Sequence, residues 1–193
     1  MAFVEAGDLK EKEFRNKSTS SKGFYLNTPE GSVLESAAIA RYISSIGQGK
    51  LGGSTPFETA QVNQWIDFFN STIEPLAQKV NKGSFGTGSI EQETYNQAHK
   101  DLKDAIRSLN SHLETGKTGF LVGGRLTVAD IFIASQLVPL YQSSLDTGFR
   151  KAMGAVTQWL ETFIKLPEVS SVLGNVKFAA KAWKPIVAAD KKK

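Results

Sequence analysis

The feature that most constrains the fold of this chain is a helix start followed by a long run of apolar residues. Thr127 can serve as the N-cap, and Asp130 three residues later can accept a hydrogen bond from its N–H, which together make a capping box. Leu126 and Ile131 flank the box as a hydrophobic staple. The residues that follow are apolar on every face, so the helix should be buried on all sides. The sequence predicts a central core helix that begins at Thr127 and breaks at Pro139 or shortly after.

The chain around residue 55 contains a second helix start. Thr55 is a capping threonine, Pro56 occupies the first helical position, and Glu58 follows at the third. The apolar pattern beyond this start has helical spacing. Pro75 lies inside that pattern and should kink or end the helix near Ile73.

The remaining helices are expected at regular intervals along the chain. A loop over residues 81–89 leads to another capping box at Ser89, which starts the most clearly amphipathic helix. Further helices are predicted over residues 149–163 and 169–173. The short connections between these helices predict an all-α bundle over residues 54–180.

Residues 1–49 are mixed in character. Residues 24–27 and 32–34 are predicted to be two short strands joined by a turn. Ser36 is expected to cap a helix that reaches about Ile46 and is closed by a glycine. The glycine-rich stretch that follows is the natural boundary with the bundle.

Composition narrows the functional classes. The sequence of 193 residues has no cysteine, which excludes disulfides, thiolate metal sites and a cysteine nucleophile. It has neither a secretory signal nor an apolar run long enough to cross a membrane, so we expect a cytoplasmic protein without membrane contact. Much of the net charge of +4 lies in the terminal lysines, and residues 181–193 are predicted to start a lysine-rich linker. Basic residues are not gathered with exposed aromatics, so no direct nucleic-acid binding is expected.

Several strings resemble one family of proteins. The Glu35–Ser36 pair and the Thr127–Asp130 box are similar to motifs of glutathione-transferase-like proteins. The strings Leu51–Pro56, Trp159–Thr162 and Ser171–Phe178 resemble the gamma subunit of eukaryotic translation elongation factor 1. The resemblance implies a mainly α, glutathione-transferase-like fold, in which an incomplete thioredoxin-like α/β half precedes the all-α helical bundle.

The resemblance also implies a glutathione site from which this sequence departs. In the family a tyrosine, serine or cysteine near the first strand stabilises the glutathione thiolate, and we expect this chain to begin after that point, without the first strand and helix. Phe24 stands where the family has a cis-proline, and a non-proline cis bond costs about 3 kcal/mol, so this contact should be lost. Glu35 and Ser36 keep the positions that hold the γ-glutamyl end of glutathione, although Ser36 would be a good N-cap in any case. The three residues are predicted to be vestigial positions, and no catalytic residue is predicted.

Other chemistry-bearing residues do not form the pattern of a site. His99 and His112 lie off the apolar stripe of their helix without a second ligand at metal spacing, so both are expected to be solvated. The tyrosines lie in apolar segments and are expected in the core or at its rim. The sequence contains no phosphate-binding loop and no serine elbow. We therefore predict no metal and no cofactor.

The resemblance implies a function without catalysis. It predicts a scaffolding gamma subunit of the elongation factor 1 complex that anchors the nucleotide-exchange subunit and is not an enzyme. Two alternatives remain open: a glutathione transferase, and a transferase-like appendage of an aminoacyl-tRNA synthetase complex. The partners implied are the exchange subunit, an aminoacyl-tRNA synthetase, or a second copy of the chain as a homodimer.

Overall fold

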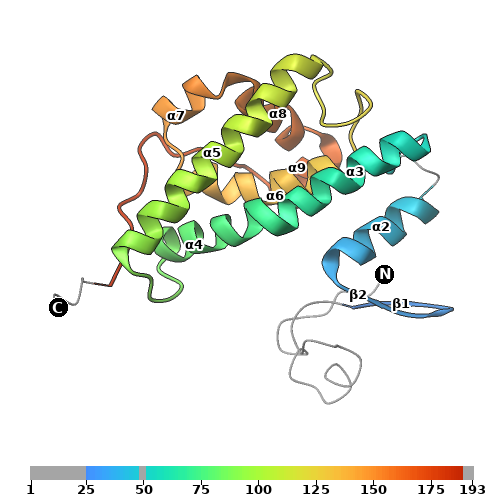
Figure 1. The fold of residues 1–193 in the computed structure, drawn as a ribbon, viewed down its shortest axis with the longest axis horizontal. Helices are drawn as coiled ribbons and strands as arrows, with labels where there is room; N and C mark the ends of the chain where they lie inside the picture. The colour runs from blue at the N-terminus through green and yellow to red at the C-terminus, as the bar shows by residue number, and fades with distance from the viewer. Residues whose placement is uncertain (1–24, 48–50, 189–193) are drawn as a thin grey trace.

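The computed structural model describes residues 25–47 and 51–188, which form a small N-terminal part and a larger helical bundle (Figure 1). The architecture is mainly α with one two-stranded sheet, as predicted. The elements in chain order are β1 (Tyr25–Thr28), β2 (Gly31–Leu34), α2 (Ser36–Ile46), α3 (Pro56–Phe68), the π-helical segment η2 (Phe69–Ile73), α4 (Glu74–Phe85), α5 (Gln92–Gly116), α6 (Val128–Ser143), α7 (Thr147–Ala152), α8 (Gly154–Ile164) and α9 (Pro167–Leu173).

Strands β1 and β2 form an antiparallel hairpin where two strands were predicted. Tyr25 pairs with Leu34, and Thr28 pairs with Gly31 across the turn. The Oγ1 atom of Thr28 closes this turn, because it accepts from the Gly31 N–H at 3.1 Å and donates to the Gly31 carbonyl at 2.8 Å. Phe24, the first residue of the predicted strand, lies outside the described residues.

Helix α2 connects the hairpin to the bundle and packs on α6. It ends where the sequence predicted, and the N–H of Gly47 closes its last turn. Arg41 fastens α2 to α3, since its Nε donates to Asn63 Oδ1 and its Nη2 to Asp67 Oδ1, both at 2.8 Å. The Arg41–Asp67 pair is largely exposed and therefore adds little stability.

The helical run that starts at Pro56 changes its geometry just before Pro75, near Ile73 as predicted. The Thr55 cap is present, with its Oγ1 accepting from the Glu58 N–H at 3.1 Å. The run then passes through η2, in which the N–H of Glu74 bonds to the carbonyl of Phe69, five residues earlier. This wider turn lets Pro75, which has no N–H, enter the first turn of α4.

Two predicted boundaries around the next loop are wrong. Helix α4 continues to Phe85, so residues 81–85 are helical rather than part of a loop. Helix α5 begins at Gln92, and its N-cap, Glu91, makes no side-chain hydrogen bond, so the predicted capping box at Ser89 is absent. The backbone here is held instead by a parallel bridge between Glu91 and Ala188, a distant contact that no local pattern could indicate.

Helix α6 is the centre of the bundle and packs against α3, α4 and α8. It begins with the predicted capping box and ends at Ser143, four residues beyond Pro139, which agrees with the predicted end at the proline or shortly after it. The last turn, with the buried Leu140, Tyr141 and Ser143, stays helical because packing outweighs the one backbone hydrogen bond that Pro139 cannot donate. Burial on all sides is also not complete, because Ile131 is 36% exposed and Ser135 is exposed.

The later helices are also divided differently from the prediction. The single helix predicted over residues 149–163 is two, since α7 ends and α8 begins on either side of Met153. Met153 has φ −110° and ψ 57°, a non-helical conformation that turns the chain between the two helices. Helix α9 starts at Pro167, two residues before the predicted start, with the proline in its first turn.

Both histidines are partly buried, and the expectation that they are solvated is wrong. His99 Nε2 lies 3.3 Å from the carbonyl oxygen of Ser144. His112 Nε2 lies 2.9 Å from the carbonyl oxygen of Leu121, and its ring packs edge-on against Trp65. Each imidazole therefore connects α5 to a loop that follows it in the chain.

The hairpin should exchange its amide hydrogens much faster than the central helix. In the described part of the chain β1 and β2 form a sheet of two four-residue strands, which is marginal by itself, whereas α6 is enclosed by the core. We expect hydrogen–deuterium exchange to show early exchange in β1 and β2 and the slowest exchange in α6. Equal protection of the two regions would contradict this view of the N-terminal part.

Candidate functional site

Of the three residues expected at a vestigial glutathione site, the structure describes Glu35 and Ser36, which lie at the corner between β2 and α2. Phe24 is outside the described residues. Glu35 and Ser36 are both exposed, and Glu35 joins the end of β2 to the start of α2. Ser36 is the first residue of α2 and does not cap it; the N-cap position belongs to Glu35, which makes no side-chain capping bond. The prediction of Ser36 as N-cap is therefore wrong.

The backbone at this corner is strained. Glu35 has φ 65° and ψ 123°, a region that non-glycine residues rarely adopt. Such strain recurs at functional sites, and the uncapped first turn of α2 presents N–H groups that suit a carboxylate. The geometry is compatible with holding an acidic group, but it supplies neither a nucleophile nor a general base.

The structural pair Thr127 and Asp130 forms a buried polar centre. Asp130 is fully buried, and its Oδ2 accepts from the N–H and the hydroxyl of Thr127, each at 2.8 Å. Its Oδ1 accepts from the Leu121 N–H at 3.0 Å and from the indole Nε1 of Trp159 at 2.9 Å. One carboxylate thus joins the start of α6, the loop before it and α8. The sequence indicated the cap but not the bond to Trp159.

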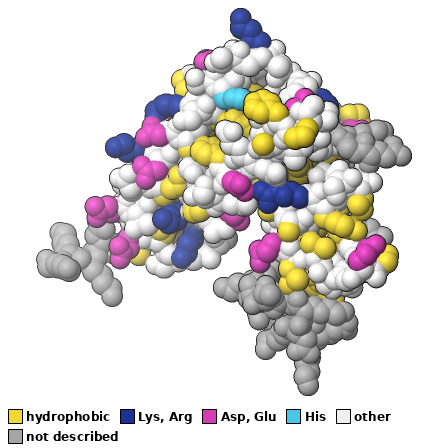
Figure 2. Space-filling model, turned by 45° about the vertical axis from the view of Figure 1, so that its right-hand side comes forward, with side chains coloured by type: hydrophobic (Ala, Val, Ile, Leu, Met, Phe, Trp, Pro, Cys, Tyr) yellow, Lys and Arg dark blue, Asp and Glu magenta, His cyan; other side chains and the backbone are white. Residues whose placement is uncertain are grey.

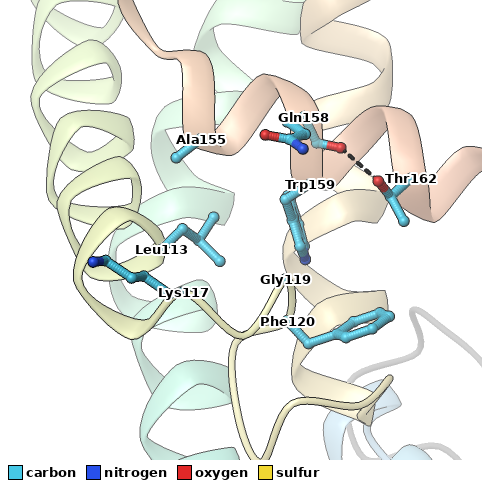
Figure 3. Close-up of a pocket in the computed structure, with 8 residues that line it drawn as sticks. All are labelled: Leu113, Lys117, Gly119, Phe120, Ala155, Gln158, Trp159 and Thr162. Atoms are coloured by element: carbon cyan, nitrogen blue, oxygen red, sulfur yellow. Dashed lines mark hydrogen bonds between the residues drawn. The ribbon is translucent and has the colours of Figure 1, made fainter.

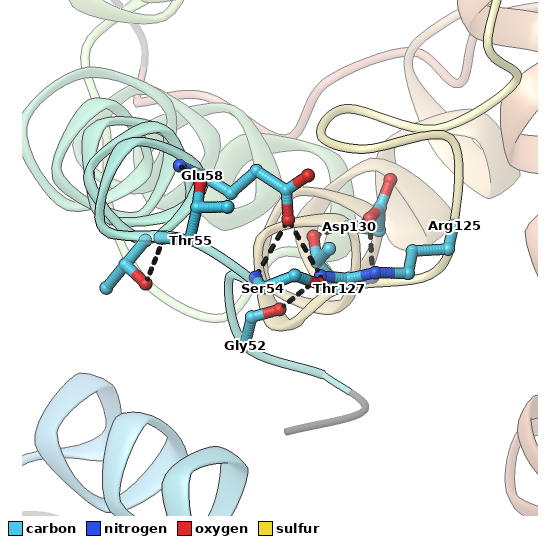
Figure 4. Close-up of polar contacts among 8 residues, drawn as sticks. Gly52, Ser54, Thr55, Glu58, Arg125, Thr127 and Asp130 are labelled. Carbon is cyan, nitrogen blue, oxygen red and sulfur yellow. Dashed lines mark hydrogen bonds and ion pairs between the residues drawn. The ribbon is translucent and has the colours of Figure 1, made fainter.

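Arg125 forms a second polar junction next to this centre, as Figure 4 shows. Its Nη2 donates to the Gly52 carbonyl and to Ser54 Oγ, both at 2.8 Å, and to Glu58 Oε2 at 3.1 Å. The Ser54 N–H also donates to Glu58, and together with Arg125 this bond lowers the pKa of the Glu58 carboxyl. The sequence did not predict a role for Arg125, although its position between a glycine pair and a helix cap could have indicated a contact between two segments.

A small hollow lies beside Trp159 (Figure 3). Leu113, Phe120 and Trp159 are among its lining residues, and Lys117 is the only charged residue among them. Its volume of about 270 Å³ lies below the range typical of small-molecule sites. The hollow therefore does not define a binding site.

The buried Tyr141 is a structural residue of the core. Burial raises the pKa of Tyr141 to about 12, which keeps its hydroxyl neutral beside Thr157 Oγ1 at 3.2 Å. Tyr95 is also in the core, as expected for tyrosines in apolar segments. Within residues 25–47 and 51–188, no group of three or more acidic or histidine side chains could hold a metal ion.

One family model and several known proteins are similar in sequence to this chain. The model for the C-terminal domain of glutathione S-transferases matches residues 92–162. Elongation factor 1-gamma-A of Xenopus laevis is 38% identical over 149 residues, which cover 77% of this chain and 33% of that protein. Elongation factor 1-gamma of Carassius auratus is 36% identical over 172 residues, 83% of this chain and 38% of that protein. The chain thus spans about a third of the length of these relatives.

Solved structures agree on the fold. The glutathione-transferase-like domain of elongation factor 1-gamma from Saccharomyces cerevisiae matches with a TM-score of 0.78 and 20% identity, over 90% of this chain and 82% of that chain. A glutathione transferase from Phanerochaete chrysosporium, solved in complex with oxidized glutathione, matches with a TM-score of 0.75 and 22% identity, over 89% and 81%.

The chain therefore has the glutathione-transferase-like fold that its motifs implied. The relatives named above are elongation factor 1-gamma proteins, and the resemblance to the transferase-like domain of that subunit is confirmed.

Replacing Asp130 by alanine should destabilise the protein strongly. The variant loses the cap and leaves the Leu121 N–H and the Trp159 indole without a partner in the core, so the free energy of unfolding should fall by at least about 3 kcal/mol. Asp146→Ala is the matched control, because Asp146 caps the short helix α7 through one bond to Phe149 and should cost about 1 kcal/mol. Urea denaturation measures both. Equal losses would show that the buried centre is no more than an ordinary cap.

His99 should make stability depend on pH. Burial and, to a smaller extent, the nearby Lys103 lower its pKa below the ordinary 6.5, against the opposing effects of the Ser144 carbonyl and Asp146. The unfolded chain then binds a proton at a higher pH than the folded protein, so this contribution is complete above about pH 6.5 and is lost as the pH falls. We expect the urea midpoint to drop between about pH 7.5 and 5.5, and to drop less in His99→Gln. An identical drop in both proteins would rule out this role for His99.

Proposed function

We propose that the chain is a non-catalytic scaffolding part of the translation elongation factor 1 complex, in which it anchors the nucleotide-exchange subunit. The similarity to elongation factor 1-gamma over 77% of the chain carries this proposal. The relatives are about three times as long, so the assignment concerns the part that they share with this chain. Residues 1–49, 54–180 and 181–193 are proposed as the thioredoxin-like part, the bundle and the start of a linker.

The state of the glutathione positions supports a function without catalysis. Phe24 replaces the proline that the family places there, and Glu35 and Ser36 are exposed at the β2–α2 corner without a described catalytic partner. Conjugation requires a group that stabilises the glutathione thiolate. The sequence offers no cysteine for this role, and around Glu35 and Ser36 the described residues show no hydroxyl that we could assign to it.

Surface charge supports a protein partner rather than nucleic acid. On the face shown in Figure 2, basic and acidic side chains are interspersed and hydrophobic side chains lie between them. Nucleic-acid binding favours basic residues gathered on one face. Across the described ranges the helices are all too short or too polar to cross a bilayer. We accordingly propose a cytoplasmic place of action, with translation.

The chain should not conjugate glutathione to a general electrophile such as 1-chloro-2,4-dinitrobenzene. Without thiolate stabilisation the rate should equal that of the uncatalysed reaction, whereas a functional transferase run beside it should exceed that background by orders of magnitude. The absorbance of the conjugate measures this, and a glutathione-affinity column should not retain the protein.

Turnover above background that disappears in Glu35→Ala would overturn the scaffold proposal in favour of a glutathione transferase. Capture of an aminoacyl-tRNA synthetase, but not of the exchange subunit, would favour the synthetase appendage instead.

A further inference from the structure

The structure contains an apolar groove to which the proposed function assigns no role. Residues of α6 and α9 line it, together with Gly47, Leu51, Leu126 and Phe163. Its volume is about 730 Å³, well above that of the hollow beside Trp159. Among its lining residues Glu168 is the only charged one and Ser135 is the only other polar side chain.

Exposed apolar side chains concentrate at this groove. Val172 is 81% exposed, Leu173 is 41% exposed and Ile131 is 36% exposed, and all three line it. Ile46, which is 64% exposed, immediately precedes the lining residue Gly47. A contiguous apolar surface of this kind is typical of an interaction site.

The lining residues on α6 and on α9 each have the spacing of one helix face. Ile131, Ser135 and Val138 follow one another at four and three residues along α6, so they form one stripe. Val169 and Val172 form a similar stripe on α9. The α6 stripe from residue 131 to residue 138 is about 10 Å long at about 1.5 Å per residue, which matches about two turns of a helix laid beside it.

A helix fits this groove better than an extended peptide. Burying a backbone N–H or carbonyl without a partner is costly, and the side chains in the groove offer few partners. The chain itself shows what an extended segment needs: residues 179–188 pack on the bundle by donating to the carbonyls of Tyr141, Ser143, Gly83 and Ile90 at helix ends and in a loop. Nine of the twelve residues that line the groove lie within α6, α8 and α9, and the side chains of these nine are apolar apart from Ser135 and Glu168. A helix satisfies its own backbone and needs only an apolar face.

Glu168 determines the charge that the occupant should carry. Its side chain is exposed at the edge of the groove, and no salt bridge to it occurs among the described residues. A lysine or arginine at the border of an apolar helix face would reach this carboxylate at the rim. Pairs of this kind favour one orientation of the partner more than they raise affinity.

We propose that the groove between α6 and α9 is a docking site for an amphipathic helix of a protein partner, with an apolar face of two or more turns and a basic residue at its border. This inference rests on the proposed function, because the partner is taken to be the nucleotide-exchange subunit of elongation factor 1.

The test measures binding of the purified exchange subunit to the full chain and to four variants. Val172→Glu places a charge against the apolar face, and affinity should fall at least about tenfold. Ser135→Arg places a long charged side chain in the groove at an exposed position and should lower the affinity by a similar factor. Glu168→Lys should weaken binding several-fold, with a smaller effect at high salt. Phe57→Glu is the matched control, since Phe57 is 72% exposed outside the groove, and its affinity should be unchanged.

The outcomes separate this inference from the function on which it rests. No binding by the unmodified chain overturns the proposed function, and the docking site with it. Binding that is equal in Val172→Glu, Ser135→Arg and Phe57→Glu overturns the docking site and leaves the proposed function standing.

Two further measurements test other occupants. If the chain alone sediments as a dimer and Val172→Glu as a monomer, the groove holds a second copy and the proposal is wrong. If Val172→Glu lowers the melting temperature well beyond Phe57→Glu, the groove is covered by the chain itself, and the proposal is again wrong. Unchanged melting with weakened binding supports it.

Discussion

The buried carboxylate of Asp130 is the point at which three segments of the bundle meet. A charged or polar group with no access to water must be fully paired, and Asp130 is paired on both oxygens by the start of α6, the preceding loop and α8. None of these segments can shift without stranding a donor in the core. The adjacent Arg125 side chain connects the loop before α6 to the segment that enters α3, so it restrains that segment as well. The position of α6, and hence of everything packed on it, depends on these two polar groups.

The N-terminal part is held by much weaker means. Among the described residues, its contacts with the bundle include α2 on α6 and the bonds from Arg41 to α3, and its described sheet has two strands. Glu35 and Ser36 therefore lie at a strained corner of the part that we expect to be less stable. A catalytic site needs side chains fixed within fractions of an ångström, whereas a docking surface on the bundle does not depend on the N-terminal part. The expected difference in stability agrees with the proposed role in assembly.

The sequence predicted elements that are specified locally and failed where distant contacts decide. The caps at Thr55 and Thr127, the hairpin and the end of α2 depend on residues within one turn, and the structure has all of them. The prolines were informative as well: the run from Pro56 changes to a π segment that ends at Ile73, before Pro75, and α6 ends at Ser143, four residues beyond Pro139. The start of α5 is set by Ala188, almost a hundred residues away. The same holds for the candidate site. The local sequence predicted the Asp130 cap, whereas the bond from Trp159, the contacts of Arg125 and the groove arise only from tertiary packing.

The groove and the central cap share residues, which links docking to stability. Leu126 and Ile131, the apolar pair that flanks the capping box, also line the groove, so one face of the start of α6 is open to solvent while the other is locked by Asp130. A helix bound there would remove this pair from water in the folded protein only. Since the unfolded chain has no groove, binding adds to the free energy of unfolding as the partner concentration rises above its dissociation constant. If the proposed docking site is correct, the protein is most stable when its partner is bound, because the apolar pair that flanks the start of α6 is then removed from water.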